Sequence, residues 1–129
     1  VIDENKNKIS FSAAQRPIVL KLKDQNTLII EKGSKFPVGG YFENDKEFKL
    51  LTYNLDEVEQ FYMFSDGYVD QFGGTNVKKY GTKQFVKTLN LIATMPMHLQ
   101  KDFLMNELDN WKGELDQIDD ILVLGVKLN

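Results

Sequence analysis

Short apolar runs separated by turn residues fill the first half of the chain. Runs rich in Ile, Val, Leu and Phe, several of them alternating with polar residues, predict strands over residues 8–13, 18–22, 27–31, 48–53 and 61–65. The segment Lys23 to Asn26 has turn composition, so the runs on either side of it predict a β-hairpin. A loop over Asn54 to Glu59 is expected to separate the last two of these strands.

A helical repeat replaces this pattern in the second half. Thr82 is a good N-cap, and Phe85, Val86, Leu89 and Ile92 follow it at helical spacing, which predicts an amphipathic helix over residues 83–93. Pro96 suits the first position of a second helix, and Gly113 is expected to end that helix. Its predicted apolar stripe contains Leu99, Phe103, Leu104, Leu108 and Trp111.

The final apolar run, Ile121 to Leu128, is too short for a typical core helix and is rich in β-branched residues, so it predicts a buried strand that returns to the sheet. Strands followed by helices and a closing strand indicate an α+β fold. We expect a mostly antiparallel sheet with two C-terminal helices.

Composition narrows the function classes. The 129 residues are the size of one domain, and an apolar fraction of 42% is typical of a globular chain. A net charge of −3 argues against binding to nucleic acid, which needs clustered Lys and Arg. The absence of Cys excludes thiolate chemistry, and no apolar run approaches the ~20 residues that cross a bilayer. The chain begins at Val1, so we expect it to be a piece of a longer protein.

Carboxylates stand at the ends of two predicted strands. Asp66 directly follows the strand over residues 61–65, and Asp119 and Asp120 directly precede the closing strand. If these strands are antiparallel neighbours, the carboxylates meet at one edge of the sheet. The plainer alternative stays open, because Asp-Gly is a common turn dipeptide and acids at strand ends keep a surface soluble.

Carboxylates that converge on an apolar sheet repel one another, so they become protonated or bind a cation. A site made of oxygen ligands, in a chain without Cys and with one His, favours Mg²⁺ or Mn²⁺ over zinc. His98 is expected to be an exposed helical residue, and Lys78 and Lys79 beside Gly73-Gly74 are interpreted as a solvated flexible loop.

Three segments, FYMFSDGYVDQFGG, KKYGTKQF and QIDDILVLGV, together resemble the C-terminal half of the metal-dependent protein phosphatases. This is the PPM or protein phosphatase 2C superfamily, and the resemblance is to its bacterial SpoIIE-like branch. Upstream, SFSAAQRPIVL and KFPVGGY are similar to the same family. The resemblance implies that residues 1–129 form the C-terminal portion of the domain, a partial β-sandwich flanked by helices.

The resemblance also implies an activity and a set of metal ligands. Family members hydrolyse phosphoserine or phosphothreonine with a water that bridges two Mn²⁺ or Mg²⁺ ions. By likeness, Asp66 and Asp119 ligate one ion, Asp70 matches a position that helps to bind a further, weaker metal, and Asp120 supports the loop. Gly67 permits the close backbone turn beside the site.

The chain departs from the family pattern at one point. An earlier Asp shortly before Gly-His-Gly, which bridges both metals in the family, is absent. We therefore expect weak metal binding and little or no activity from this chain alone. The missing half also leaves sheet edges and apolar faces uncovered, which predicts self-association.

The SpoIIE-like branch suggests a cytoplasmic phosphatase in bacterial partner switching, acting on a phosphorylated protein of the anti-sigma-factor antagonist type. No nucleic acid and no membrane contact by this segment are expected, although the parent protein could carry a sensory or membrane-attached domain. Two alternatives stay open. One is a non-catalytic interaction module of the same fold, and the other is a two-metal phosphodiesterase.

Overall fold

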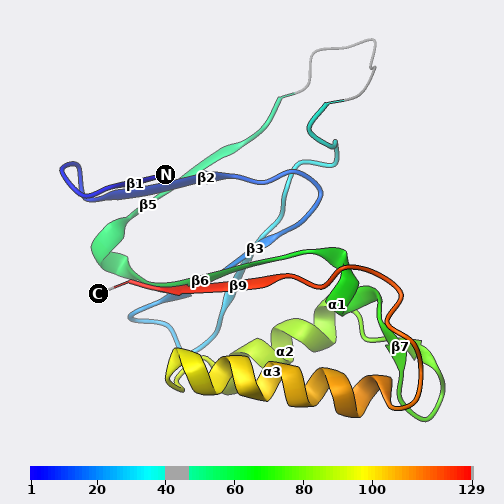
Figure 1. The fold of residues 1–129 in the computed structure, drawn as a ribbon. Helices are drawn as coiled ribbons and strands as arrows, with labels where there is room; N and C mark the ends of the chain where they lie inside the picture. Colours follow the sequence, from blue (N-terminus) through cyan, green and yellow to red (C-terminus); the bar gives the residue numbers. More distant parts are fainter. Residues whose placement is uncertain (40–46, 129) are drawn as a thin grey trace. The chain divides into compact units, whose positions relative to one another are not determined.

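A computed structural model describes residues 1–39 and 47–128 (Figure 1). Gly40 and Tyr41 of the KFPVGGY segment lie outside the described residues. The chain divides into two compact units, Val1–Met63 with Lys127–Asn129, and Phe64–Val126. None of the helices in the described part is long and apolar enough to cross a bilayer.

The first sheet has the strand order β1-β2-β5 and is antiparallel throughout. Strand β2 (Lys8–Ser12) pairs along its whole length with β5 (Leu50–Asn54). Both strands were expected from the apolar pattern, with boundaries shifted by one or two residues. The short strand β1 (Ile2–Asp3) was not predicted, because two residues give no periodicity to recognise.

The second sheet has the order β4-β3-β6-β9. Strands β3 (Ile18–Leu22) and β4 (Ile29–Glu31) form the predicted hairpin. Strand β6 (Val58–Phe64) is antiparallel to β3 and begins inside the segment that was predicted as a loop. The rest of that loop contains the 3₁₀ turn η1 (Leu55–Glu57).

Side chains connect the two sheets in a layered arrangement. The ring of Phe11 on β2 lies 6.4 Å from the ring of Phe61 on β6 between centroids, and 5.9 Å from the ring of Tyr53 on β5. The Tyr53 hydroxyl donates a hydrogen bond to Glu31 on β4. Burial, reinforced by this carboxylate, raises the pKa of Tyr53 to about 12. The α+β fold with a partial β-sandwich is therefore confirmed.

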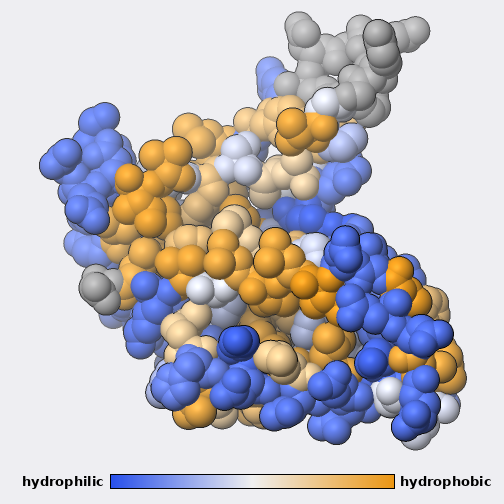
Figure 2. Space-filling view, in the orientation of Figure 1, coloured by the Kyte–Doolittle hydropathy of each residue, from blue (hydrophilic) through white to orange (hydrophobic). Residues whose placement is uncertain are grey.

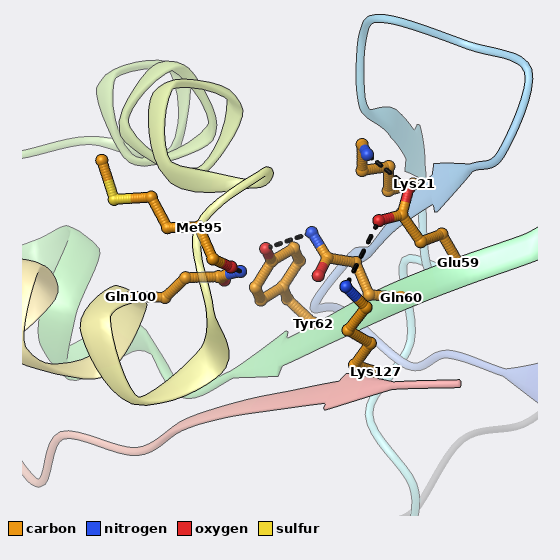
Figure 3. Close-up of polar contacts among 7 residues, drawn as sticks. All are labelled: Lys21, Glu59, Gln60, Tyr62, Met95, Gln100 and Lys127. Atoms are coloured by element: carbon orange, nitrogen blue, oxygen red, sulfur yellow. Dashed lines mark hydrogen bonds and ion pairs between the residues drawn. The ribbon is translucent and has the colours of Figure 1, made fainter. Parts of the chain in front are cut away.

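A polar cluster links strands β3, β6 and β9 of the second sheet (Figure 3). Glu59 on β6 accepts a hydrogen bond from Lys21 on β3 and lies 3.7 Å from the ammonium of Lys127 on β9. The hydrogen bond from Lys21 is the main reason that the pKa of Glu59 lies below its usual value. On the same strand the buried Gln60 amide donates to the Tyr62 hydroxyl, at 2.9 Å.

In the second unit, the two predicted C-terminal helices are present as α2 (Thr82–Ile92) and α3 (Met97–Lys112). Helix α2 buries the apolar residues predicted for its inner face. The expected N-cap at Thr82 is wrong, since Gly81 precedes the helix and Thr82 is its first residue. Pro96 likewise precedes α3, and Gly113 ends that helix with its N–H bonded to the Asp109 carbonyl.

The buried face of α3 differs from the predicted stripe. Leu104 is buried as expected, but Leu99 is 46% exposed and the amide-bearing Gln100 is buried in its place. The Gln100 side chain donates a hydrogen bond to the Met95 carbonyl, at 2.8 Å, which satisfies its buried N–H (Figure 3). A polar residue whose hydrogen bond is made locally does not appear in an apolar pattern, and this explains the error.

Two small elements of this unit were not predicted. Helix α1 (Asp66–Asp70) follows β6 directly, and strands β7 (Phe72–Gly73) and β8 (Lys78–Lys79) form a short hairpin. The interpretation of Lys78 and Lys79 as a flexible loop is therefore wrong, because both pair with β7.

A row of aromatic rings runs through the second unit and contributes to its core. Phe64 lies against Phe85, Phe85 against Tyr68, Tyr68 against Tyr80, and Tyr80 against Trp111, with centroid distances between 4.7 and 5.3 Å. Three of these four pairs are edge-to-face, an arrangement that adds to the free energy gained by burial. The row fixes α1, which carries Tyr68, against α2 and the end of α3.

The prediction that the closing strand β9 (Val123–Lys127) is buried is wrong. It is the last strand in the order of the second sheet, Leu124 is 43% exposed, and the preceding Leu122 is 64% exposed. Apolar surface is visible along this strand in Figure 2. The run of apolar residues made the strand recognisable, but it could not indicate an edge position.

Candidate metal-binding site

The apolar strand β6 leads directly into a carboxylate. The strand ends at Phe64, Ser65 is the N-cap, and Asp66 is the first residue of the short helix α1. The Ser65-Asp66-Gly67 segment is therefore a change from strand to helix and not a hairpin turn. Helix α1 is held in place by Tyr68, whose buried hydroxyl donates to the Leu104 carbonyl at 2.9 Å.

Strands β6 and β9 are antiparallel neighbours, as the sequence predicted. The Ser65 N–H donates to the Leu122 carbonyl at one end, and the Leu128 N–H donates to the Glu59 carbonyl at the other. Because the later residue of β6 pairs with the earlier residue near β9, the two strands run in opposite directions. The end of β6 and the start of β9 therefore lie at the same edge.

Hydrogen bonds of the Ser65 side chain and a close backbone approach at Gly67 join the segments that carry Asp66 and Asp119. The Ser65 hydroxyl donates to the Asp120 carbonyl, at 2.9 Å, and accepts the N–H of Leu122, also at 2.9 Å. A Cβ atom added to Gly67 would lie 2.3 Å from the Asp120 carbonyl oxygen. Asp66 is flanked by both of these contacts, so the two aspartate-bearing segments meet.

Local hydrogen bonds orient the exposed Asp119-Asp120 pair. One carboxylate oxygen of Asp119 accepts the Asp120 N–H at 2.7 Å, and the Asp119 carbonyl accepts the Gln117 side-chain amide, also at 2.7 Å. Asp120 contacts Ser65 and Gly67 through its carbonyl group. This geometry suits the loop-supporting role expected for Asp120, while Asp66 and Asp119 as metal ligands stay a prediction.

Asp70 lies at the other end of α1, one helical turn from Asp66. Its carboxylate lies 3.1 Å from the ammonium of Lys79 on β8. Both side chains are substantially exposed, at 39% for Asp70 and 52% for Lys79. A lysine therefore already occupies a position from which it competes with a metal for this carboxylate.

The donors at this edge suit a hard cation. Asp66 and Asp119 offer carboxylate oxygens, which Mg²⁺ and Mn²⁺ accept together with several waters. No three His, Cys, Asp or Glu side chains within residues 1–39 and 47–128 form a cluster that could hold a metal. A cation at Asp66 and Asp119 would therefore need water or other donors to complete its coordination shell.

Two supporting residues were not identified from the sequence. Ser65 belongs to the SDG segment, but only the pairing of β6 with β9 shows what its hydroxyl holds. Gln71 is the fully buried C-cap residue of α1, its side chain binds the segment after α3, and it carries no motif signal. His98 is exposed on α3, as expected.

Comparisons with known proteins identify the relatives of this arrangement. The family model described as Stage II sporulation protein E (SpoIIE) matches residues 1–129. A search of curated proteins finds no match.

Two solved structures share the fold. The "SiaA-PP2C domain of Pseudomonas aeruginosa" aligns with a TM-score of 0.83 and 22% identity over 99% of this chain and 49% of that chain. The "Phosphatase Domain of the Cell Fate Determinant SpoIIE from Bacillus subtilis" aligns with a TM-score of 0.63 and 18% identity over 100% of this chain and 56% of that chain. This chain thus spans about half the length of both.

Proposed function

Since this chain belongs to the SpoIIE family, we propose that it is the C-terminal part of a metal-dependent protein serine/threonine phosphatase domain. The proposal rests on one observation. The Ser65-Asp66-Gly67 segment lies directly against the Asp119-Asp120 segment, with the Ser65 hydroxyl 2.9 Å from the Asp120 carbonyl. Of the two solved structures of similar fold, one is a PP2C domain and the other is a phosphatase domain, and this supports the same proposal.

A divalent ion, when bound, would lower the pKa of a coordinated water and neutralise charge on a phosphoryl group. Asp66 and Asp119 would hold that ion by their carboxylates. Gly67 keeps the backbone close enough for both segments to reach it, and Ser65 fixes the position of the Asp119-Asp120 loop. Such a site needs no nucleophilic Cys, Ser or His.

The phosphatase activity proposed here belongs to a longer domain. The chain spans about half of the similar domains, and the bridging Asp before Gly-His-Gly is absent from it. We expect that these 129 residues alone do not hydrolyse a phosphopeptide at the rate of an intact domain. As substrate we propose a cytoplasmic phosphoprotein of the anti-sigma-factor antagonist type.

Metal binding by the chain itself tests the core of the proposal. Mn²⁺ is titrated into the wild-type chain and followed by the loss of the free-ion paramagnetic resonance signal. Asp66→Asn and Asp119→Asn should each weaken binding by about 10-fold or more, since each removes a charged ligand. Asp102→Asn and Asp109→Asn, on the exposed surface of α3, are the matched controls and should leave binding unchanged.

Equal binding by all five proteins would contradict the proposed site. The activity is tested in the parent protein with a phosphoserine peptide and a phosphodiester as competing substrates. Hydrolysis of the phosphopeptide, lost in Asp66→Asn, is the expected result. Hydrolysis of the phosphodiester alone would favour the two-metal phosphodiesterase.

A second candidate function is a non-catalytic interaction module. The exposed Leu122 and Leu124 at the edge of the second sheet favour it, because an apolar sheet edge can pair with another chain. A parent protein that binds no Mn²⁺ and shows no phosphatase activity, yet retains its fold, would support this alternative.

A further inference from the structure

Gln71 is a buried residue on which several elements of the second unit converge. It follows α1 as the C-cap residue and has no exposed surface. Its side-chain amide donates to the Asp116 carbonyl at 2.9 Å and to the Phe72 carbonyl at 3.1 Å. Its own carbonyl accepts the Trp111 indole N–H at 3.1 Å and the Tyr80 N–H at 3.0 Å.

The segment that Gln71 binds has little structure of its own. Residues 113–120 connect α3 to the approach of β9, form no helix or strand, and are all exposed. Among the described residues, side chains from outside the segment bind its backbone at two carbonyl groups, Gln71 at Asp116 and Ser65 at Asp120. An exposed segment with few such bonds opens easily, so each anchor has a large effect on its position.

The amide of Gln71 is only half satisfied. Among the described residues, no group donates a hydrogen bond to its Oε1 atom, although that atom is buried. A buried polar atom without a partner opposes folding. An apolar side chain would avoid this cost, so the stabilising part of the amide is its donor half, which binds the neighbouring Phe72 carbonyl and the distant Asp116 carbonyl.

We propose that Gln71 is a positioning residue which, through Asp116, holds the Asp119-Asp120 segment against Ser65 and Gly67. In this role it acts on the backbone of the segment and is not itself proposed as a metal ligand. Its effect on metal binding rests on the proposed function, but its effect on the segment does not. A displacement of even about 1 Å in a ligand-bearing segment is enough to spoil a binding geometry.

The test compares two buried glutamines in the same unit. Gln71→Met keeps the approximate size of the side chain and removes the amide, and Gln100→Met does the same on α3, where the amide binds Met95. Amide hydrogen exchange of the metal-free chain is measured at residues 117–122, and Mn²⁺ affinity is measured by paramagnetic resonance. Gln71→Leu replaces Gln71→Met if the latter does not fold.

We expect exchange at residues 117–122 to rise about 10-fold or more in the Gln71 variant and to stay unchanged in the Gln100 variant. Mn²⁺ affinity should fall by about 10-fold in the Gln71 variant alone, as is usual when a support behind a ligand is removed. If the wild-type chain binds no Mn²⁺ and the Gln71 variant still shows faster exchange, the positioning role stands and the proposed metal site is rejected.

Two results would overturn the inference. One is unchanged exchange at residues 117–122 in the Gln71 variant. The other is a uniform rise in exchange across the unit in both glutamine variants, which would show a general contribution to stability and no positioning of the loop.

Discussion

Gly67 and Asp120 are in direct backbone contact, and a Cβ atom on Gly67 would lie 2.3 Å from the Asp120 carbonyl oxygen. Ala is normally favoured over Gly inside a helix by about 1 kcal/mol, so Gly67→Ala in α1 would stabilise the chain if space allowed. We expect the opposite, a loss of about 2 kcal/mol from overpacking against backbone that cannot move aside. Urea unfolding measures this change, and a gain in stability would show that the contact is loose.

The Ser65 hydroxyl holds both Asp120 and Leu122, so its removal should loosen the junction of β6 and β9. We expect Ser65→Ala to lower the free energy of unfolding by about 1 to 2 kcal/mol, because two hydrogen bonds are lost. Ser65→Thr keeps the hydroxyl and is the matched control, with a smaller effect. Equal losses in the two variants would indicate that packing and not hydrogen bonding sets the effect.

Lys79 and Asp70 form an exposed ion pair, which contributes less than about 1 kcal/mol to stability. Lys79→Ala should therefore leave the unfolding midpoint nearly unchanged. The same change removes a cation that competes with metal for Asp70, so Mn²⁺ binding at high concentration should increase. Lys78→Ala, the adjacent exposed residue of β8, is the control and should have no effect on either measurement.

Glu59 gives a pH-dependent contribution to stability. Its pKa lies below the usual 4.5, chiefly because of the hydrogen bond from Lys21, so the ionised form is favoured in the folded chain. This contribution is complete above pH 4.5 and is lost as the pH falls through the lowered pKa. Glu59→Gln should cost about 1 kcal/mol at pH 7.

The difference between the wild type and Glu59→Gln should shrink as the pH falls below 4.5, because the wild-type carboxyl group then becomes neutral as well. Thermal unfolding across this pH range measures the difference, with the exposed Glu4→Gln as control. A difference that is constant with pH would exclude the ion pairs with Lys21 and Lys127 as its source.

Self-association is expected because β9 ends its sheet and carries exposed apolar side chains. We propose that a second copy of the chain pairs with this edge, and light scattering at high concentration should then show a dimer or a larger species. Leu124→Lys should shift the chain toward monomer, since charges on edge strands oppose pairing. Leu91→Lys, at an exposed position of α2, should leave the association state unchanged. A monomeric wild type would contradict the prediction.

The apolar pattern predicted those elements that are long enough for the spacing of their apolar residues to repeat. Strand β3 was predicted residue for residue, and α2 and α3 were found within one residue at each end. Helix α1 was missed, because five residues make little more than one turn and Asp-Gly also suits a turn. The pairing of β6 with β9 was expected as the arrangement that lets the carboxylates meet, which is a chemical argument and not a pattern, and the order of the other strands was not predicted beyond the hairpin of β3 and β4.

Supporting contacts could not be predicted in the same way. The Ser65 hydroxyl and the Gln71 amide act on carbonyl groups more than 40 positions away in the chain. Every residue has the same backbone carbonyl, so the spacing of residue types along the sequence does not indicate which carbonyl a side chain will bind. Burial of Gln71 and Gln100 also runs against the usual preference of polar residues for the surface.

The row of rings that ends at Trp111 gives the chain a built-in optical probe. Trp111 is the single tryptophan, its ring lies 5.1 Å from that of Tyr80, and its indole N–H binds the Gln71 carbonyl. The six-membered part of the indole would also lie within 2.9 Å of a Cβ on Gly74, so the hairpin closes over it. Its emission wavelength therefore reports solvent entry at the root of the Asp119-Asp120 segment, without an added label.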